Sequence, residues 1–193
     1  DVEAILIIES DGADEEAVVR EIETVARICR ESGAREVSVA RDEDERETLW
    51  RARRSVSPSL ARKAPNKLGE DITVPRSAIP EAIRRVKGIS ARYGLPIVVF
   101  GHAGDGNLHP NILFDQRDPE QWAKIEPIVG EIFSMALELG GTLSGEHGIG
   151  TLKRPYLEQA LGPVSIDVQQ RIKQALDPLN IMNPGKVLPE RRM

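Results

Sequence analysis

In the stretch VFGHAGDGNLHPNILF, residues 99–114, two apolar runs flank a centre rich in turn residues. The run LPIVVFGH, residues 95–102, predicts a buried strand, and LHPNILF, residues 108–114, predicts a second one. The AGDGN between them contains Asp-Gly and Gly-Asn pairs, which tolerate the positive φ of a tight turn. We therefore predict an antiparallel hairpin here.

This hairpin contains His102 and His109, two of the three histidines in the chain. The two residues are seven apart, so on one straight strand they would point to opposite faces. A hairpin can bring them together, because His102 ends the incoming strand and His109 begins the returning one. Asn111 lies two residues beyond His109 and shares its strand face. The hairpin thus places two imidazoles and a carboxamide around one spot.

The third histidine lies in LSGEHGIG, residues 143–150, which supplies Glu146 and His147. Two imidazoles and a carboxylate form a three-ligand set with open positions, as in catalytic Zn²⁺, Mn²⁺ or Fe²⁺ sites. The neighbouring glycines allow close approach of the backbone to a ligand. Histidines that only hydrogen-bond loops would also fit this pattern. The placement of all three on glycine-rich bends favours function, since binding residues concentrate on loops.

The segments outside the hairpin alternate between strand and helix patterns. Apolar β-branched runs predict strands, and amphipathic runs with acidic or proline starts predict helices. The predicted strands cover residues 2–10, 35–40 and 71–75. The predicted helices cover residues 11–33, 42–56, 77–94, 118–141 and 164–178. A loop is predicted at residues 57–70 and a C-terminal tail at residues 178–193. This mixture predicts an α+β fold, ferredoxin-like, with an antiparallel or mixed sheet and helices on one side.

The helix predicted over residues 118–141 has a clear start signal. Asp118 is the expected cap, Pro119 takes the first helical position and Gln121 completes a capping box. Pro127 lies inside the same segment and should kink or break the helix, because proline lacks an N–H and crowds the preceding turn.

Composition excludes several function classes. The chain of 193 residues has a net charge of −5 and offers no basic stripe for nucleic acid. Its single cysteine, Cys29, excludes an internal disulfide and a cysteine zinc site, and fits a reducing compartment. No apolar run is long enough to span a membrane, and no signal peptide is visible. The chain begins DVEAILIIE without a Met, so we expect a piece of a longer protein.

The glycine-rich segments do not match the common phosphate-binding or hydrolase motifs. GHAGDGNLH lacks the third glycine of G-x-G-x-x-G, and a strand follows it where a helix should. No Gly-Lys-Ser/Thr of a P-loop, no H-E-x-x-H and no Gly-x-Ser-x-Gly occurs in the chain.

Three segments instead resemble a known family: GHAGDGNLHPNILFD, residues 101–115; SGEHGIGTLKRPYL, residues 144–157; and NPGKVLP, residues 183–189. Together they resemble the C-terminal domain of the FAD-linked oxidases of the vanillyl-alcohol-oxidase superfamily. The resemblance is closest to the FAD-binding subunits of glycolate oxidase and to D-lactate dehydrogenases. It runs from about Val2 to Pro189, nearly the whole chain.

The resemblance implies a role for each matching residue. In metal-containing members, the ligands match His102, His109 and Glu146, and His147 matches the general base. The remaining matches are contacts, namely Asn111, Arg53, Ser57 and Lys67 for the substrate, and Asn107 and Gly148 for the cofactor. Arg53 falls in LWRARRSVS, which resembles the family's Trp-x-x-Arg segment, and would grip the substrate carboxylate.

The resemblance also implies cofactors and partners. FAD would be bound mainly by an N-terminal domain absent from this chain, and a divalent metal, zinc or manganese, is allowed. The substrate would be a small 2-hydroxy acid, and this chain would be the substrate-binding cap, inactive alone. Further flavin and iron–sulfur subunits are allowed as partners. The expected location is the cytoplasm, with peripheral attachment to the inner membrane allowed.

Two alternatives belong to other functional classes. A free-standing metal hydrolase could use the same His/His/Glu set, and would turn over esters or phosphates without flavin. A non-catalytic subunit or regulatory module of the α+β type would fold but bind neither metal nor acid.

Overall fold

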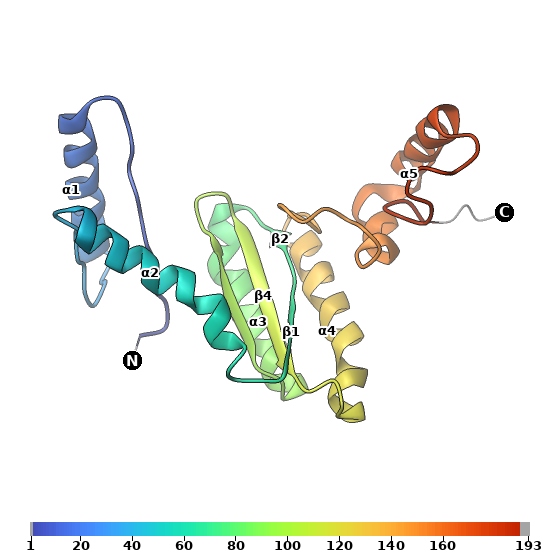
Figure 1. Cartoon of the computed structure of the whole chain (residues 1–193), viewed down its shortest axis with the longest axis horizontal. Coiled ribbons are helices and arrows are strands. Elements are labelled where there is room, and N and C mark those ends of the chain that lie inside the picture. Colours follow the sequence, from blue (N-terminus) through green and yellow to red (C-terminus); the bar gives the residue numbers. More distant parts are fainter. Residues whose placement is uncertain (1, 190–193) are drawn as a thin grey trace. The chain divides into compact units, whose positions relative to one another are not determined.

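The computed structural model describes residues 2–189, and the chain divides into two compact units, Asp1–Leu60 and Ala61–Met193 (Figure 1). The first unit contains helices α1, Glu15–Glu31, and α2, Glu43–Leu60. Asp14 caps α1 by accepting a hydrogen bond from the Ala17 N–H, and acidic residues follow in the first turn. Both helices confirm predictions, although α2 extends four residues beyond the predicted end at residue 56.

The strands predicted at residues 2–10 and 35–40 are wrong, because neither segment forms a strand. Residues 2–10 form an apolar, β-branched run, residues 35–40 alternate between apolar and polar, and Ile5, Leu6 and Val39 are exposed. A strand needs a hydrogen-bonded neighbour, which local sequence does not supply. Among residues 2–189, no strand pairs with either segment. The ferredoxin-like strand–helix–strand opening is therefore not formed.

The second unit is built around a four-stranded antiparallel sheet. Strand β4, Asn107–Phe114, is central and pairs on one edge with β3, Ile97–His102. Strands β1, Asn66–Gly69, and β2, Ile72–Thr73, follow one another along its other edge. The predicted hairpin is confirmed. The loop predicted at residues 57–70 is wrong at both ends, where α2 and β1 form.

The gap between β1 and β2 has a local cause. The register pairs Gly69 with Asn111 and Ile72 with Leu108, which places Pro110 opposite Glu70. The Glu70 N–H donates to the Pro110 carbonyl at 2.8 Å. Proline has no N–H to return this bond, so the ladder is interrupted at this pair.

Three helices complete the unit, and two of them cover one face of the sheet. They are α3, Ile79–Tyr93, α4, Pro119–Glu138, and α5, Leu157–Leu176. Helices α3 and α4 lie side by side against the sheet (Figure 1). Asp118 caps α4 and Pro119 starts it, as predicted. Pro127 does not break this helix, because the buried face that includes Ile128 and Ile132 holds it in the core.

The core lies between one sheet face and helices α3 and α4. The even-numbered residues of β4 point into it, including Leu108 and Ile112. The odd-numbered residues Asn107, His109 and Asn111 therefore point to the opposite face. The mixed α+β class with helices on one side is confirmed, and the sheet face away from those helices carries the predicted site residues.

Candidate metal and substrate site

The hairpin brings His102 and His109 together, as predicted. His102 pairs with Asn107 across the ladder, and Phe100 pairs with His109, so both histidines lie on one face. Their ring centroids are 5.6 Å apart, with the edge of one ring toward the other. The turn depends on Gly106, which has φ +75° and whose Cβ position would lie 2.0 Å from the Val74 carbonyl oxygen.

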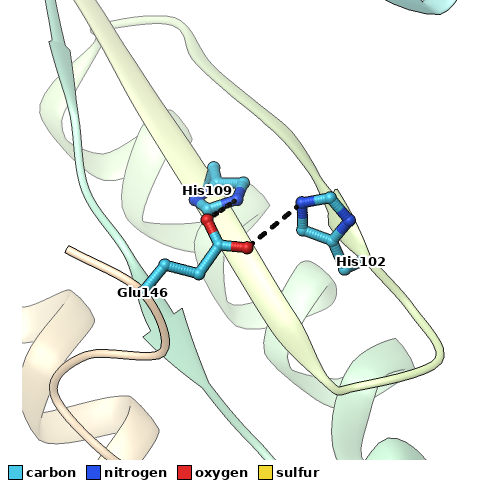
Figure 2. A group of neighbouring side chains, drawn as sticks. All are labelled: His102, His109 and Glu146. Carbon is cyan, nitrogen blue, oxygen red and sulfur yellow. Dashed lines mark ion pairs between the residues drawn. The ribbon is translucent and has the colours of Figure 1, made fainter.

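Glu146 completes the cluster from the loop that follows α4. Its carboxylate lies between the two imidazoles, 3.4 Å from Nε2 of His102 and 3.7 Å from Nε2 of His109 (Figure 2). The ligand atoms of the three residues all lie within 4.8 Å of one another. Two imidazole nitrogens and one carboxylate oxygen at this spacing suit a divalent ion such as zinc or manganese. The structure thus brings together the predicted ligands.

Burial differs among the three residues and affects their chemistry. His109 is buried, whereas His102 and Glu146 are half exposed. Burial lowers the pKa of His109, and the negative charge of Glu146 offsets part of this effect. A neutral imidazole is the form that binds a metal. One of the three candidate ligands is therefore buried, and the other two are accessible to solvent.

His147 lies against the same cluster but on another side of it. Its ring stacks on His109, with centroids 5.4 Å apart and planes inclined by 14°. Both neighbours therefore approach His109, Glu146 with its carboxylate 3.7 Å from Nε2 and His147 with its stacked ring. Glu146 reaches the two imidazoles while the exposed His147 ring remains available to a bound molecule. This arrangement can hold a cation and a proton acceptor next to one another.

Asp71 accepts hydrogen bonds from the loop that carries these two residues, and it was not predicted from the sequence. Its buried carboxylate accepts hydrogen bonds from Ser144 Oγ at 2.6 Å and from the His147 N–H at 2.9 Å. Burial alone would raise the pKa of Asp71, but bonds from Ser144, the His147 N–H and Asn107 outweigh it and hold this pKa far below its usual range. The only available sequence signal was an acidic residue at the start of a short strand.

The other predicted contacts fall at different places. Asn111 is buried and donates to the His109 carbonyl at 2.7 Å. Lys67 is exposed on the same sheet face, since its partner is Leu113 on β4. The Asn107 amide donates to Asp71 at 2.5 Å. These positions bring Asn111 and Asn107 next to the cluster.

Three further predicted contacts lie on loops or in the other unit. The Gly148 N–H donates to Ser144 Oγ at 2.8 Å, directly after Glu146 and His147. Arg53 and Ser57 lie on α2 in the first unit, on one helix face with half-buried side chains. Their roles in substrate binding stay predictions.

Comparison with known proteins decides the family. Residues 1–187 match the family model described as FAD linked oxidases, C-terminal domain. The chain belongs to this family. The alternative of a free-standing metal hydrolase is not favoured by a match that spans almost the whole chain.

Several curated relatives agree with this family. The glycolate oxidase subunit GlcD of Bacillus subtilis is 46% identical over 184 residues, which cover 95% of this chain and 39% of that protein. GlcD of Escherichia coli K12 is 38% identical, over 98% of this chain and 38% of its own length. A probable mitochondrial D-lactate dehydrogenase of Danio rerio is 33% identical, over 95% and 37%. The chain therefore spans about two fifths of the length of these relatives.

A solved structure supports the fold. The 4-ethylphenol oxidase from Gulosibacter chungangensis, solved with isoeugenol, matches 90% of this chain and 38% of its own chain, with a TM-score of 0.56 and 19% identity. At this identity the match shows a shared fold.

Among residues 2–189, no helix is both long and apolar enough to cross a membrane.

Proposed function

We propose that this chain is the substrate-binding C-terminal domain of an FAD-dependent oxidoreductase. The reaction is the oxidation of a D-2-hydroxy acid, of the glycolate or D-lactate type, to the 2-oxo acid. The observation that carries the proposal is the cluster of His102, His109 and Glu146 on one sheet face. It occurs within a family match to FAD-linked oxidases and among relatives named glycolate oxidase and D-lactate dehydrogenase.

The family supports FAD as the cofactor, and the donor set supports the proposal of a divalent metal. FAD, when bound, supplies the acceptor for the two electrons and the Cα hydrogen of the substrate. We assign most of its binding to an N-terminal domain outside this chain, with Asn107 and Gly148 as contacts from this one. A divalent ion, zinc or manganese, would be held by His102, His109 and Glu146 and would supply Lewis-acid chemistry at the substrate hydroxyl.

The side chains of this chain then have distinct tasks. Arg53 binds the substrate carboxylate, because its planar guanidinium can donate two parallel hydrogen bonds to both oxygens. Asn111, Ser57 and Lys67 are assigned as further substrate contacts. His147 accepts the hydroxyl proton, because an imidazole nitrogen can take up a proton and this ring is exposed beside the cluster.

We propose the partners and location from the resemblance to the glycolate oxidase subunits. The chain would close over the flavin of its own FAD domain, and further flavin and iron–sulfur subunits would carry the electrons onward. The name of the GlcD relatives as subunits supports an assembly of this kind. We propose that the protein is located in the cytoplasm, either free or attached peripherally to the inner membrane.

Anaerobic flavin reduction tests the function. The FAD-loaded full-length protein is mixed with glycolate, D-lactate or L-lactate, and the absorbance of oxidised flavin is followed. We expect rapid bleaching by glycolate or D-lactate, and none by L-lactate. No bleaching by either of the first two acids, with turnover of a phosphate or carboxylate ester instead, would contradict the proposal.

A further inference from the structure

Asp71 lies at the centre of the hydrogen bonds that hold the loop of residues 144–148. We propose that Asp71 is the positioning residue for Glu146 and His147, and that its carboxylate fixes the place from which both side chains reach the His109 face. The inference rests on the proposed function, since that function gives Glu146 and His147 their tasks. It adds a residue that touches neither substrate nor metal.

Consecutive backbone N–H groups converge on one oxygen of Asp71. Oδ2 accepts from the N–H groups of Gly145 at 3.0 Å, Glu146 at 3.1 Å and His147 at 2.9 Å. Successive N–H groups in a turn form a concave site that binds an anion. Here the anion is a side chain of the protein itself. Because these N–H groups face Asp71, the backbone of the loop is fixed at the two residues that carry the site.

The carboxylate is needed because the groups hydrogen-bonded to its two oxygens are all donors. Its side chain is 0% exposed, so no water replaces a lost bond. Besides the loop, Ser144 Oγ donates at 2.6 Å and Asn107 Nδ2 at 2.5 Å, and Lys153 Nζ lies 3.3 Å from Oδ2. An asparagine at this position would direct an NH₂ group at some of these donors. A neutral substitute of nearly the same shape therefore cannot satisfy the loop.

The strand register links Asp71 directly to the metal cluster. Since Gly69 pairs with Asn111 and Ile72 with Leu108, Asp71 lies opposite His109 on the adjacent strand. The residue that holds the loop and the histidine that the loop approaches are thus cross-strand neighbours. A change at Asp71 is expected to alter the distance between Glu146 and His109.

The test compares Asp71→Asn with Asp177→Asn in the holoenzyme. Asp177 is a matched control, because it is also buried and accepts backbone N–H bonds, from Ile181 at 3.0 Å and Met182 at 2.9 Å, outside the 144–148 loop. Hydrogen-exchange mass spectrometry follows the amides of residues 145–147, and chelator competition measures zinc affinity. For Asp71→Asn we expect at least about tenfold faster exchange and about 10–100-fold weaker zinc binding. Asp177→Asn should leave both unchanged.

The proposal is overturned if the Asp71→Asn protein folds and its amides at residues 145–147 exchange as slowly as in the wild type. It is also overturned if these amides exchange faster but the variant binds zinc as tightly as the wild type. If Asp71→Asn does not fold, Ser144→Ala decides, since it removes one donor to Asp71 and the acceptor of the Gly148 N–H. This variant should show faster exchange and several-fold weaker zinc binding, and wild-type values would overturn the proposal. If the wild type takes up no zinc, only the proposed metal site is contradicted. The role of Asp71 would then be tested by the amide exchange at residues 145–147. Failure of the proposed function would appear separately, as absent flavin reduction in the wild type.

Discussion

The backbone N–H of His147 donates a 2.9 Å hydrogen bond to Asp71 Oδ2, although the two residues are 76 positions apart in the sequence. Asp71 belongs to the edge segment of the sheet, and His147 to a loop that begins after α4. The bond therefore joins the sheet to the loop that carries Glu146 and His147. Sites supported by a regular element are held more accurately than sites on loops alone.

Gly145 should tolerate no side chain. A Cβ at this position would lie 2.0 Å from Asn107 Nδ2 and 2.6 Å from Thr73 Oγ1. We expect Gly145→Ala to lower the free energy of unfolding by about 1–3 kcal/mol, because the loop must move away from the sheet. The measurement is urea unfolding followed by circular dichroism. Gly104→Ala is the control, since no atom lies within 4 Å of its Cβ position, and equal losses in both variants would contradict the account.

Glu70 should make the protein less stable as pH rises. Burial raises its pKa from 4.5 to about 7, with part of the effect offset by the charge of Lys153. The folded state then holds a proton that the unfolded state releases between these two pH values, so the contribution of Glu70 to stability is fully present below pH 4.5 and is lost up to about pH 7. The full effect corresponds to about 3 kcal/mol.

The test of this pH effect is Glu70→Gln, which keeps the shape and removes the titration. Unfolding free energies are measured in urea at pH 5 and pH 8 for both proteins. Wild type should lose more stability between these conditions than the variant does, by up to about 3 kcal/mol. Parallel pH dependences in the two proteins would show that Glu70 does not titrate in this range.

Arg53 should determine the affinity for the acid substrate. If it binds the carboxylate, Arg53→Ala will raise KM by about 10–100-fold, the range for loss of a charged hydrogen bond in a binding site. The assay is steady-state oxidation of the preferred hydroxy acid by the holoenzyme. Arg51→Ala is the control, because Arg51 is exposed two residues away on α2 and has no assigned role. A similar KM in both variants would remove Arg53 from the substrate site.

The hairpin and its histidines could be predicted because the signals are local. The turn residues predict the hairpin. The alternation of side chains along a strand predicts that His109 and Asn111 lie on the same face. The start of α4 could be predicted in the same way, because Asp118 and Pro119 act within the first turn of the helix. In each case the interacting groups lie close together in the sequence.

The remaining features depend on contacts between distant residues. The role of Asp71 requires a loop more than seventy positions away, so no local pattern marks it. The same reason explains the wrong strands at residues 2–10 and 35–40, where the composition is suitable but no partner strand is present in the described part of the chain. At Pro127 the local signal predicts a helix break, but α4 continues through this residue because its neighbours pack into the core.

The most direct test of the central claim is the metal content of the purified protein, measured by elemental analysis after incubation with zinc or manganese and gel filtration. We expect about one divalent ion per chain in the wild type, and a loss of most of it in His109→Ala, which removes the buried histidine of the cluster. Asp105→Asn, on the exposed hairpin turn outside the cluster, should retain the ion. A wild type without bound metal, or a His109→Ala variant with undiminished content, would contradict the claim that these residues form a metal site.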